Sequence, residues 1–82
     1  MRHARPDDLA LVAPLLEKLR AIDGLKERTP GSFYFKSKGF LHFHEHEGEI
    51  LADVKEGGDW VRLSAGKRDW PALVKKVKSL VG

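Results

Sequence analysis

Residues 40–49 read Phe40-Leu41-His42-Phe43-His44-Glu45-His46-Glu47-Gly48-Glu49, and this run holds three of the four histidines of the chain. Apolar and polar residues alternate along it, which is the pattern of a half-buried β-strand. Side chains two residues apart on a strand point to the same side of a sheet. The run therefore predicts a strand over Phe40–His46 that presents His42, His44 and His46 on one face.

The same two-residue period continues on both sides of this strand. It predicts further strands at Ser32–Lys36, Glu49–Lys55 and Trp60–Ser64. Glycine-containing turns separate the strands, and Gly57-Gly58 can supply the positive φ that a tight hairpin needs. Connections this short join neighbouring strands antiparallel. The centre of the chain thus predicts a four-stranded antiparallel meander.

Apolar residues at three- and four-residue spacing predict one helix on each side of the meander. The first covers Arg5 to Leu25, with Gly24 as its left-handed cap. Pro14 lies inside it and either kinks the helix or separates a short first turn from a main helix that opens near Pro14. The second helix opens at Asp69, with Pro71 in its first turn, where proline is tolerated.

The predicted order is α-β-β-β-β-α, with residues 25–31 as a loop. Residues 1–82 are long enough for one small domain. Helices at both ends of a sheet region predict an α+β fold in which both helices pack on one face of the sheet.

Composition narrows the functional classes. The chain has no cysteine, which excludes disulfides, thiolate metal sites and cysteine nucleophiles. No apolar run approaches the ~20 residues of a membrane span, and the N-terminus lacks a signal-peptide pattern. We therefore expect a soluble cytoplasmic protein with no membrane partner. The net charge of +3, from 15 basic and 12 acidic residues, permits nucleic-acid binding without requiring it.

The alternation leaves one sheet face uncovered by helices, and that face is predicted to bind a partner. It mixes aromatic, histidine and cationic side chains, which are enriched where a surface meets another molecule. The alternative interpretation is structural, because such side chains also form stabilising cross-strand pairs. The predicted binding face comprises Tyr34, Lys36, Phe40, His42, His44, His46, Trp60 and Arg62.

We expect this face to serve a non-enzymatic binding or self-association module, with a homodimer ahead of nucleic acid as its partner. A weaker alternative is RNA binding, because aromatic rings on an open sheet can stack bases while cations meet phosphates. No catalytic residues are predicted, since neither a glycine-rich phosphate loop nor an oriented nucleophile is recognisable.

The runner-up interpretation, ahead of RNA binding, is a site for zinc or another divalent metal. Histidine is the commonest metal ligand, and His-x-His on a strand can place two rings on one ion. His42 and His46 lie about 13 Å apart along a regular strand, so the adjacent pair His42 and His44 is the better candidate, with Asp53 from the next strand as a third ligand. His3 lies in the N-terminal tail and is expected to have no role.

The chain resembles a group of known proteins in two segments, Gly31 to Glu45 and Leu51-Ala52-Asp53-Val54. The Phe-Leu-His-Phe-His-Glu segment resembles that of a group of small uncharacterised bacterial proteins, in which it precedes an Ala-Asp-Val strand. The resemblance implies that Lys36, His42, His44, Glu45 and Asp53 belong together, and it implies no reaction.

The predicted order of helices and strands is also similar, more distantly, to that of double-stranded-RNA-binding folds. These include HicA-type toxins, which resemble this chain in layout and act as ribonucleases on mRNA. Their histidine follows a Gly-Ser step, whereas Phe33 follows Gly31-Ser32 here. That difference argues against a ribonuclease.

Overall fold

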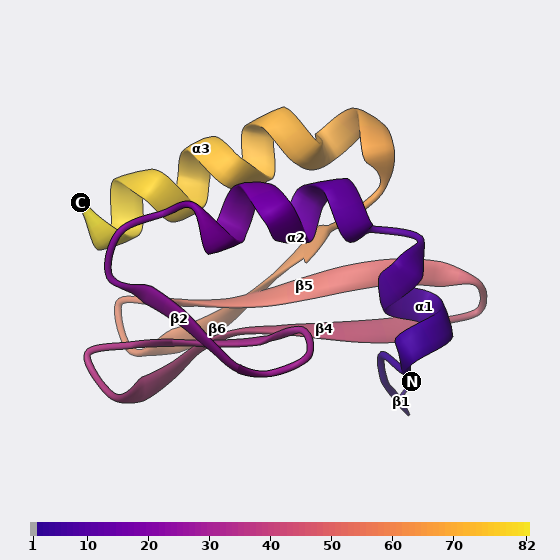
Figure 1. Ribbon diagram of the computed structural model, residues 1–82, viewed down its shortest axis with the longest axis horizontal. Coiled ribbons are helices and arrows are strands. Elements are labelled where there is room, and N and C mark those ends of the chain that lie inside the picture. The colour runs from indigo at the N-terminus through magenta and orange to yellow at the C-terminus, as the bar shows by residue number, and fades with distance from the viewer. Residues whose placement is uncertain (1) are drawn as a thin grey trace.

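A computed structural model describes residues 2–82. The strands form one antiparallel sheet in the order β2-β3-β4-β5-β6, and β1 pairs with β4. Figure 1 shows α2 and α3 side by side over one face of the sheet. In the same view α1 lies at one end of the sheet, close to the N-terminus of the chain. The elements are β1 (Arg2–His3), α1 (Pro6–Ala10), α2 (Ala13–Arg20), β2 (Leu25–Thr29), β3 (Ser32–Phe35), β4 (Lys38–His46), β5 (Glu49–Glu56), β6 (Asp59–Ser64), a 3-10 turn (Lys67–Asp69) and α3 (Trp70–Val81).

The first predicted helix is divided in two. Pro14 lies in the first turn of α2, where its missing N–H costs no hydrogen bond, so the alternative of a separate main helix is confirmed. At the start of α1, the Asp8 carboxylate accepts a hydrogen bond from the backbone N–H of Arg5 at 2.9 Å. The helical region ends at Arg20, and Gly24 adopts its positive φ of 88° in the turn that follows.

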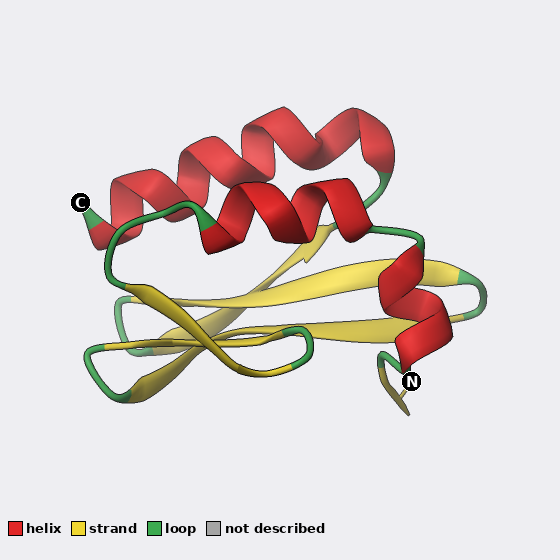
Figure 2. Ribbon diagram, viewed as in Figure 1, coloured by secondary structure: helices red, strands yellow, loops and turns green. Residues whose placement is uncertain are grey.

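The expectation of a loop over residues 25–31 was wrong, because Leu25–Thr29 forms the edge strand β2. Only Leu25 of this strand is buried, so the segment lacks the apolar alternation that identifies a strand. A turn at Pro30-Gly31 then leads into β3 (Figure 2). The meander therefore has five strands where four were predicted.

A sixth strand, β1, adds two residues from the N-terminus. Arg2 lies opposite Glu45 of β4, and His3 lies opposite His44. Two ion pairs hold Arg2, one to Asp8 at 2.7 Å and one to Glu45 at 3.3 Å. The N-terminal residues are thus fixed to the sheet by backbone pairing and by charge.

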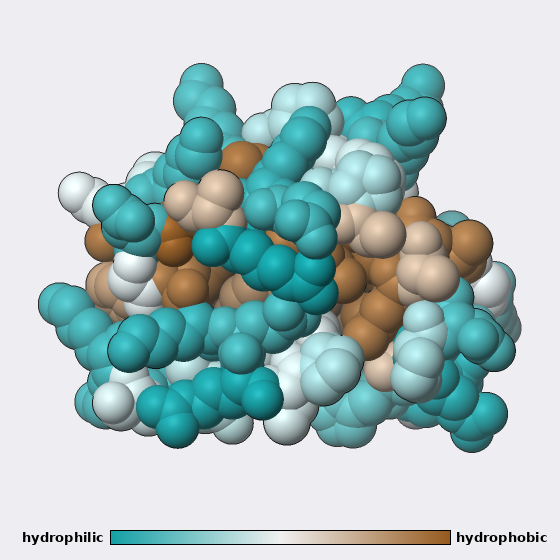
Figure 3. Space-filling model, in the orientation of Figure 1, coloured by the Kyte–Doolittle hydropathy of each residue, from teal (hydrophilic) through white to brown (hydrophobic). Residues whose placement is uncertain are grey.

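The core lies between the sheet and the helices. Leu15, Leu19, Phe33 and Leu41 are fully buried there, and hydrophobic residues gather along the seam between the two layers in Figure 3. Trp70 anchors the start of α3, because its indole N–H donates to the Ala65 carbonyl at 2.8 Å. No helix within residues 2–82 combines the length and apolarity needed to cross a membrane.

A β-bulge in β4 changes the side on which Phe40 lies. Phe33 pairs with Leu41, but the next residue, Tyr34, pairs with Gly39, so Phe40 is the extra residue. Phe40 is consequently buried in the core, where its ring meets Phe35 edge-on at a centroid distance of 5.8 Å. The prediction that Phe40 belongs to the uncovered face was therefore wrong.

Candidate functional site

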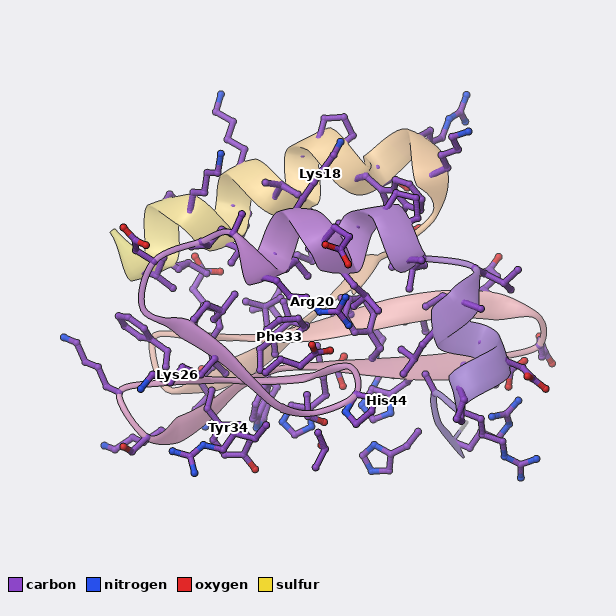
Figure 4. The ribbon with its side chains drawn as sticks, viewed as in Figure 1. Lys18, Arg20, Lys26, Phe33, Tyr34 and His44 are labelled. Atoms are coloured by element: carbon purple, nitrogen blue, oxygen red, sulfur yellow. The ribbon has the colours of Figure 1, made fainter. Side chains whose placement is uncertain are left out.

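The face of the sheet away from α2 and α3 is the candidate site, here called the open face. Figure 4 shows Tyr34 and His44 on this side, while Phe33 points between the sheet and the helices. The strand registers bring side chains from all six strands to the open face. Its residues are His3, Lys26, Arg28, Ser32, Tyr34, His42, His44, Leu51, Asp53, Lys55, Trp60, Arg62 and Ser64.

Two further residues of the predicted binding face lie away from its centre. Lys36 lies in the turn between β3 and β4 with a φ of 54°, and its ammonium sits 5.3 Å from the ring centroid of Phe35. Because β3 ends at Phe35, the strand alternation that predicted Lys36 on the open face does not extend to it, although Lys36 lines a hollow together with Lys26, Arg28 and Tyr34. His46 lies at the exposed end of β4, where its nearest acidic partner is Glu47 at 3.9 Å.

The centre of the open face is a polar network across β4, β5 and β6. The hairpin register places Asp53 opposite both His42 and Arg62. The Arg62 guanidinium donates to both carboxylate oxygens of Asp53, at 2.9 and 3.1 Å, and this hydrogen-bonded pair lowers the pKa of Asp53. His44 Nε2 also lies 3.1 Å from Asp53 Oδ2. Asp53 is therefore an ionised carboxylate whose charge is compensated within the protein.

Three imidazoles, those of His3, His42 and His44, form a cluster beside this network. The His3 and His44 ring centroids are 4.8 Å apart, and the rings of His42 and His44 are stacked at 6.4 Å. The expectation that His3 has no role missed this contact. Only the pairing of β1 with β4 creates it, and a two-residue strand has no recognisable sequence pattern.

The predicted metal site is not favoured by this geometry. Both oxygens of Asp53 accept hydrogen bonds from Arg62, and displacing that cation would cost the pair its compensation. In the part of the chain that the structure describes, no group of three or more His, Cys, Asp or Glu side chains is arranged to hold a metal ion. Metal binding by His42, His44 and Asp53 stays a prediction.

Two aromatic rings on the open face each lie beside a cation. Trp60 is 45% exposed, with the Lys55 ammonium 4.9 Å from its ring centroid. The Arg28 guanidinium lies 5.4 Å from the centroid of Tyr34. The sequence allows Lys55 to be assigned by extending the period from Asp53, whereas Arg28 lies in β2, which has no apolar alternation.

His42 joins the histidine cluster to Trp60. Its ring meets the indole edge-on at a centroid distance of 4.7 Å. Burial is the largest effect that lowers the pKa of His42, the positive charges that His44 and His3 can carry add to it, and Asp53 acts in the opposite direction. The folded protein therefore favours neutral His42.

We expect acidification to destabilise the fold through His42. Because the pKa of His42 is lower in the folded than in the unfolded chain, the unfolded chain binds more protons below a pH of about 6.5. The free energy of unfolding should fall as the pH drops from 7 toward 5. The variant His42→Gln should reduce this loss in urea titrations at each pH, and His46→Gln serves as the exposed control. Parallel profiles for wild type and His42→Gln would contradict the assignment.

Comparisons with known proteins give no family from which a function could be carried over to this chain. No protein-family model matches the chain, and neither the curated proteins nor the solved structures contain a match. The resemblance to small uncharacterised bacterial proteins stays a prediction.

Proposed function

We propose that the protein is a non-enzymatic binding module that holds single-stranded nucleic acid, RNA foremost, on the open face of its sheet. The observation that carries the proposal is the pairing of two aromatic rings of the open face with cations, the exposed Trp60 with Lys55 and the partly buried Tyr34 with Arg28. Proteins that bind single strands combine base-stacking rings with cations that track the phosphates.

The distance between the rings of Tyr34 and Trp60 suits a single-stranded nucleic acid that runs across the sheet. Tyr34 lies on β3 and Trp60 on β6, three inter-strand steps away, or about 14 Å at the usual strand separation. Gly39 lies opposite Tyr34 on β4 and has no side chain of its own, and the His42 ring leans over it, with Nε2 3.5 Å from the position that a Cβ of Gly39 would occupy. Several nucleotides could therefore lie across the open face with a base on each ring.

The charge of the open face also supports an anionic ligand. Asp53, the acidic residue at its centre, is compensated by Arg62. Glu56, at the end of β5, pairs with Lys76 of α3 at 2.9 Å. Lys26, Arg28 and Lys55 are left as cations that can meet phosphates.

The test is fluorescence anisotropy with a short labelled single-stranded RNA at low salt. Stacking on a protein ring is worth about 1–3 kcal/mol per base, so Trp60→Ala and Tyr34→Ala should each weaken binding roughly 5- to 150-fold. Lys55→Ala should reduce the slope of log affinity against log salt by about 0.7 for each lost phosphate contact. The matched control is Lys75→Ala, which removes an exposed lysine from α3 on the other layer.

Two results would overturn the proposal. One is the absence of binding at low salt, where electrostatic association is strongest. The other is equal affinity for wild type, Trp60→Ala and Tyr34→Ala, which would place any binding elsewhere on this basic chain. A single-stranded DNA of the same sequence, run in parallel, tests the preference for RNA.

A further inference from the structure

The two edges of the sheet differ in their protection against pairing with another strand. In β2 the register shifts between Glu27 and Thr29, and Lys26 and Arg28 are exposed. Bulges and charged side chains of this kind blunt an edge. In contrast, β6 pairs with β5 along Asp59–Ser64 without a register shift and contains neither proline nor lysine. Its charged residues are Asp59, beside the turn, and Arg62, whose guanidinium is bound to Asp53. The less protected edge of the sheet is therefore β6.

The hairpin register defines which backbone groups β6 leaves free. Glu56 and Asp59 flank the two-residue turn at Gly57-Gly58 and pair with each other. In an antiparallel ladder, alternate residues direct N–H and C=O toward the partner strand and away from it. Counting from the turn, Trp60, Arg62 and Ser64 direct their backbone groups outward. A further strand can bond to all three.

We propose that this edge pairs with the same edge of a second copy of the chain, antiparallel and around a two-fold axis at Val61. The two sheets then continue into one another, with both open faces on the same side. In this register Val61 lies opposite Val61 of the second copy, and Trp60 lies opposite Arg62. Moving the axis one residue toward Ser64 would place Arg62 against Arg62, and like charges directly opposite destabilise a sheet. Moving it one residue toward Asp59 would place Trp60 against Trp60 and separate each Trp60 from Arg62 of the other copy.

The side chains at the edge complement a second copy. Trp60 is exposed, and in this register it lies beside Arg62 of the second copy, whose guanidinium is held by Asp53; the symmetry makes this neighbouring Trp–Arg pair twice. Tryptophan and arginine are also the side chains most enriched among residues that dominate interface energies. Next to this strand, a hollow of about 230 Å³ between β6 and α3 is lined by apolar and polar side chains, Leu63, Ala72 and Leu73 with Ser64, Asp69 and Lys76.

The absence of cysteine from the chain allows a direct test by cross-linking. Directly opposed residues of a non-hydrogen-bonded antiparallel pair have Cα atoms about 4.5 Å apart, within the range that a disulfide spans. In the proposed register, Val61→Cys brings one cysteine of each copy to that position. Under mild oxidation this variant should form a covalent dimer rapidly, and wild type should show the mass of two chains in sedimentation equilibrium.

Two single-cysteine controls test the register of the proposed pairing as well as the dimer itself. Leu63→Cys lies in the same strand, but in this register its counterpart is about 13 Å away, four residues along. Ser79→Cys is exposed on α3 and reports random collision. Both should cross-link much more slowly than Val61→Cys. Equal rates for the three variants, or a monomer for wild type at high micromolar concentration, would overturn the proposal.

This inference does not depend on nucleic-acid binding. Tyr34 lies on β3, distant in register from the β6 edge, so Tyr34→Ala should weaken RNA binding and leave the mass of two chains unchanged. Conversely, Val61→Lys places two like charges opposite each other on the helix-covered side and should give a monomer. A Val61→Lys variant that remained dimeric would also contradict the pairing.

Discussion

Replacing Phe33 with alanine is expected to lower the free energy of unfolding by about 3–5 kcal/mol. Phe33 is 1% exposed and lies opposite Leu41 in the middle of the core, so its removal leaves a cavity that β3 and β4 cannot close. A chain of 82 residues has a total stability on the order of 4–12 kcal/mol. The variant should therefore lose a large fraction of its total stability, as urea denaturation followed by circular dichroism would show.

Tyr34→Ala is the matched control for Phe33→Ala. The two aromatic residues are adjacent in β3 but point to opposite faces, and Tyr34 is only partly buried on the open face. Its truncation should cost markedly less stability. Similar losses for both variants would show that the two faces of β3 are equally important for folding, contrary to the burial described above.

Gly31→Ala is expected to cost roughly 2–5 kcal/mol of stability, the sum of two effects. Gly31 has a φ of 77°, a conformation that costs an alanine about 1–2 kcal/mol. A Cβ at this position would also lie only 2.8 Å from Leu9 Cδ2, in the buried contact between the β2–β3 turn and α1. Urea titrations of the variant would measure the combined cost.

Gly48→Ala separates these two effects. Gly48 has a φ of 83°, and nothing lies within 4 Å of a Cβ built on it. Its substitution therefore reports the backbone cost alone, and Gly31→Ala should exceed it by the overpacking cost of about 1–3 kcal/mol. In a Leu9→Ala background this excess should disappear. Equal costs at the two glycines would contradict the close approach of Leu9.

The sequence predicted the centre of the fold because its signals there are redundant. In β5, Ile50, Ala52 and Val54 alternate with polar residues, and a two-residue glycine turn sets the register of the next strand. The same alternation correctly placed His42, His44, Asp53, Trp60 and Arg62 on one side of the sheet. The helix of Trp70–Val81 was predictable from its apolar spacing and from Pro71.

The remaining features depend on contacts between distant segments. Pairing with β3 makes Leu25–Thr29 a strand, although its own residues carry little apolar pattern. The bulge at Phe40 buries two consecutive residues, which simple alternation cannot predict. The ion pair between Asp53 and Arg62 also depends on such a contact. The β5–β6 register brings the two residues opposite each other, and the side-chain geometry then joins them.

The strand pairings also indicate the order in which parts of the chain fold. From β2 to β6 every strand pairs with its neighbour in the chain, so these hairpins close short loops, which is typical of rapidly folding topologies. The pairing of β1 with β4 joins residues about forty positions apart and involves only two residues. This pairing should form last and open first, with backbone amides that exchange with solvent well before those of the central strands. The histidine cluster is therefore completed only in the final step of folding, when His3 arrives beside His44.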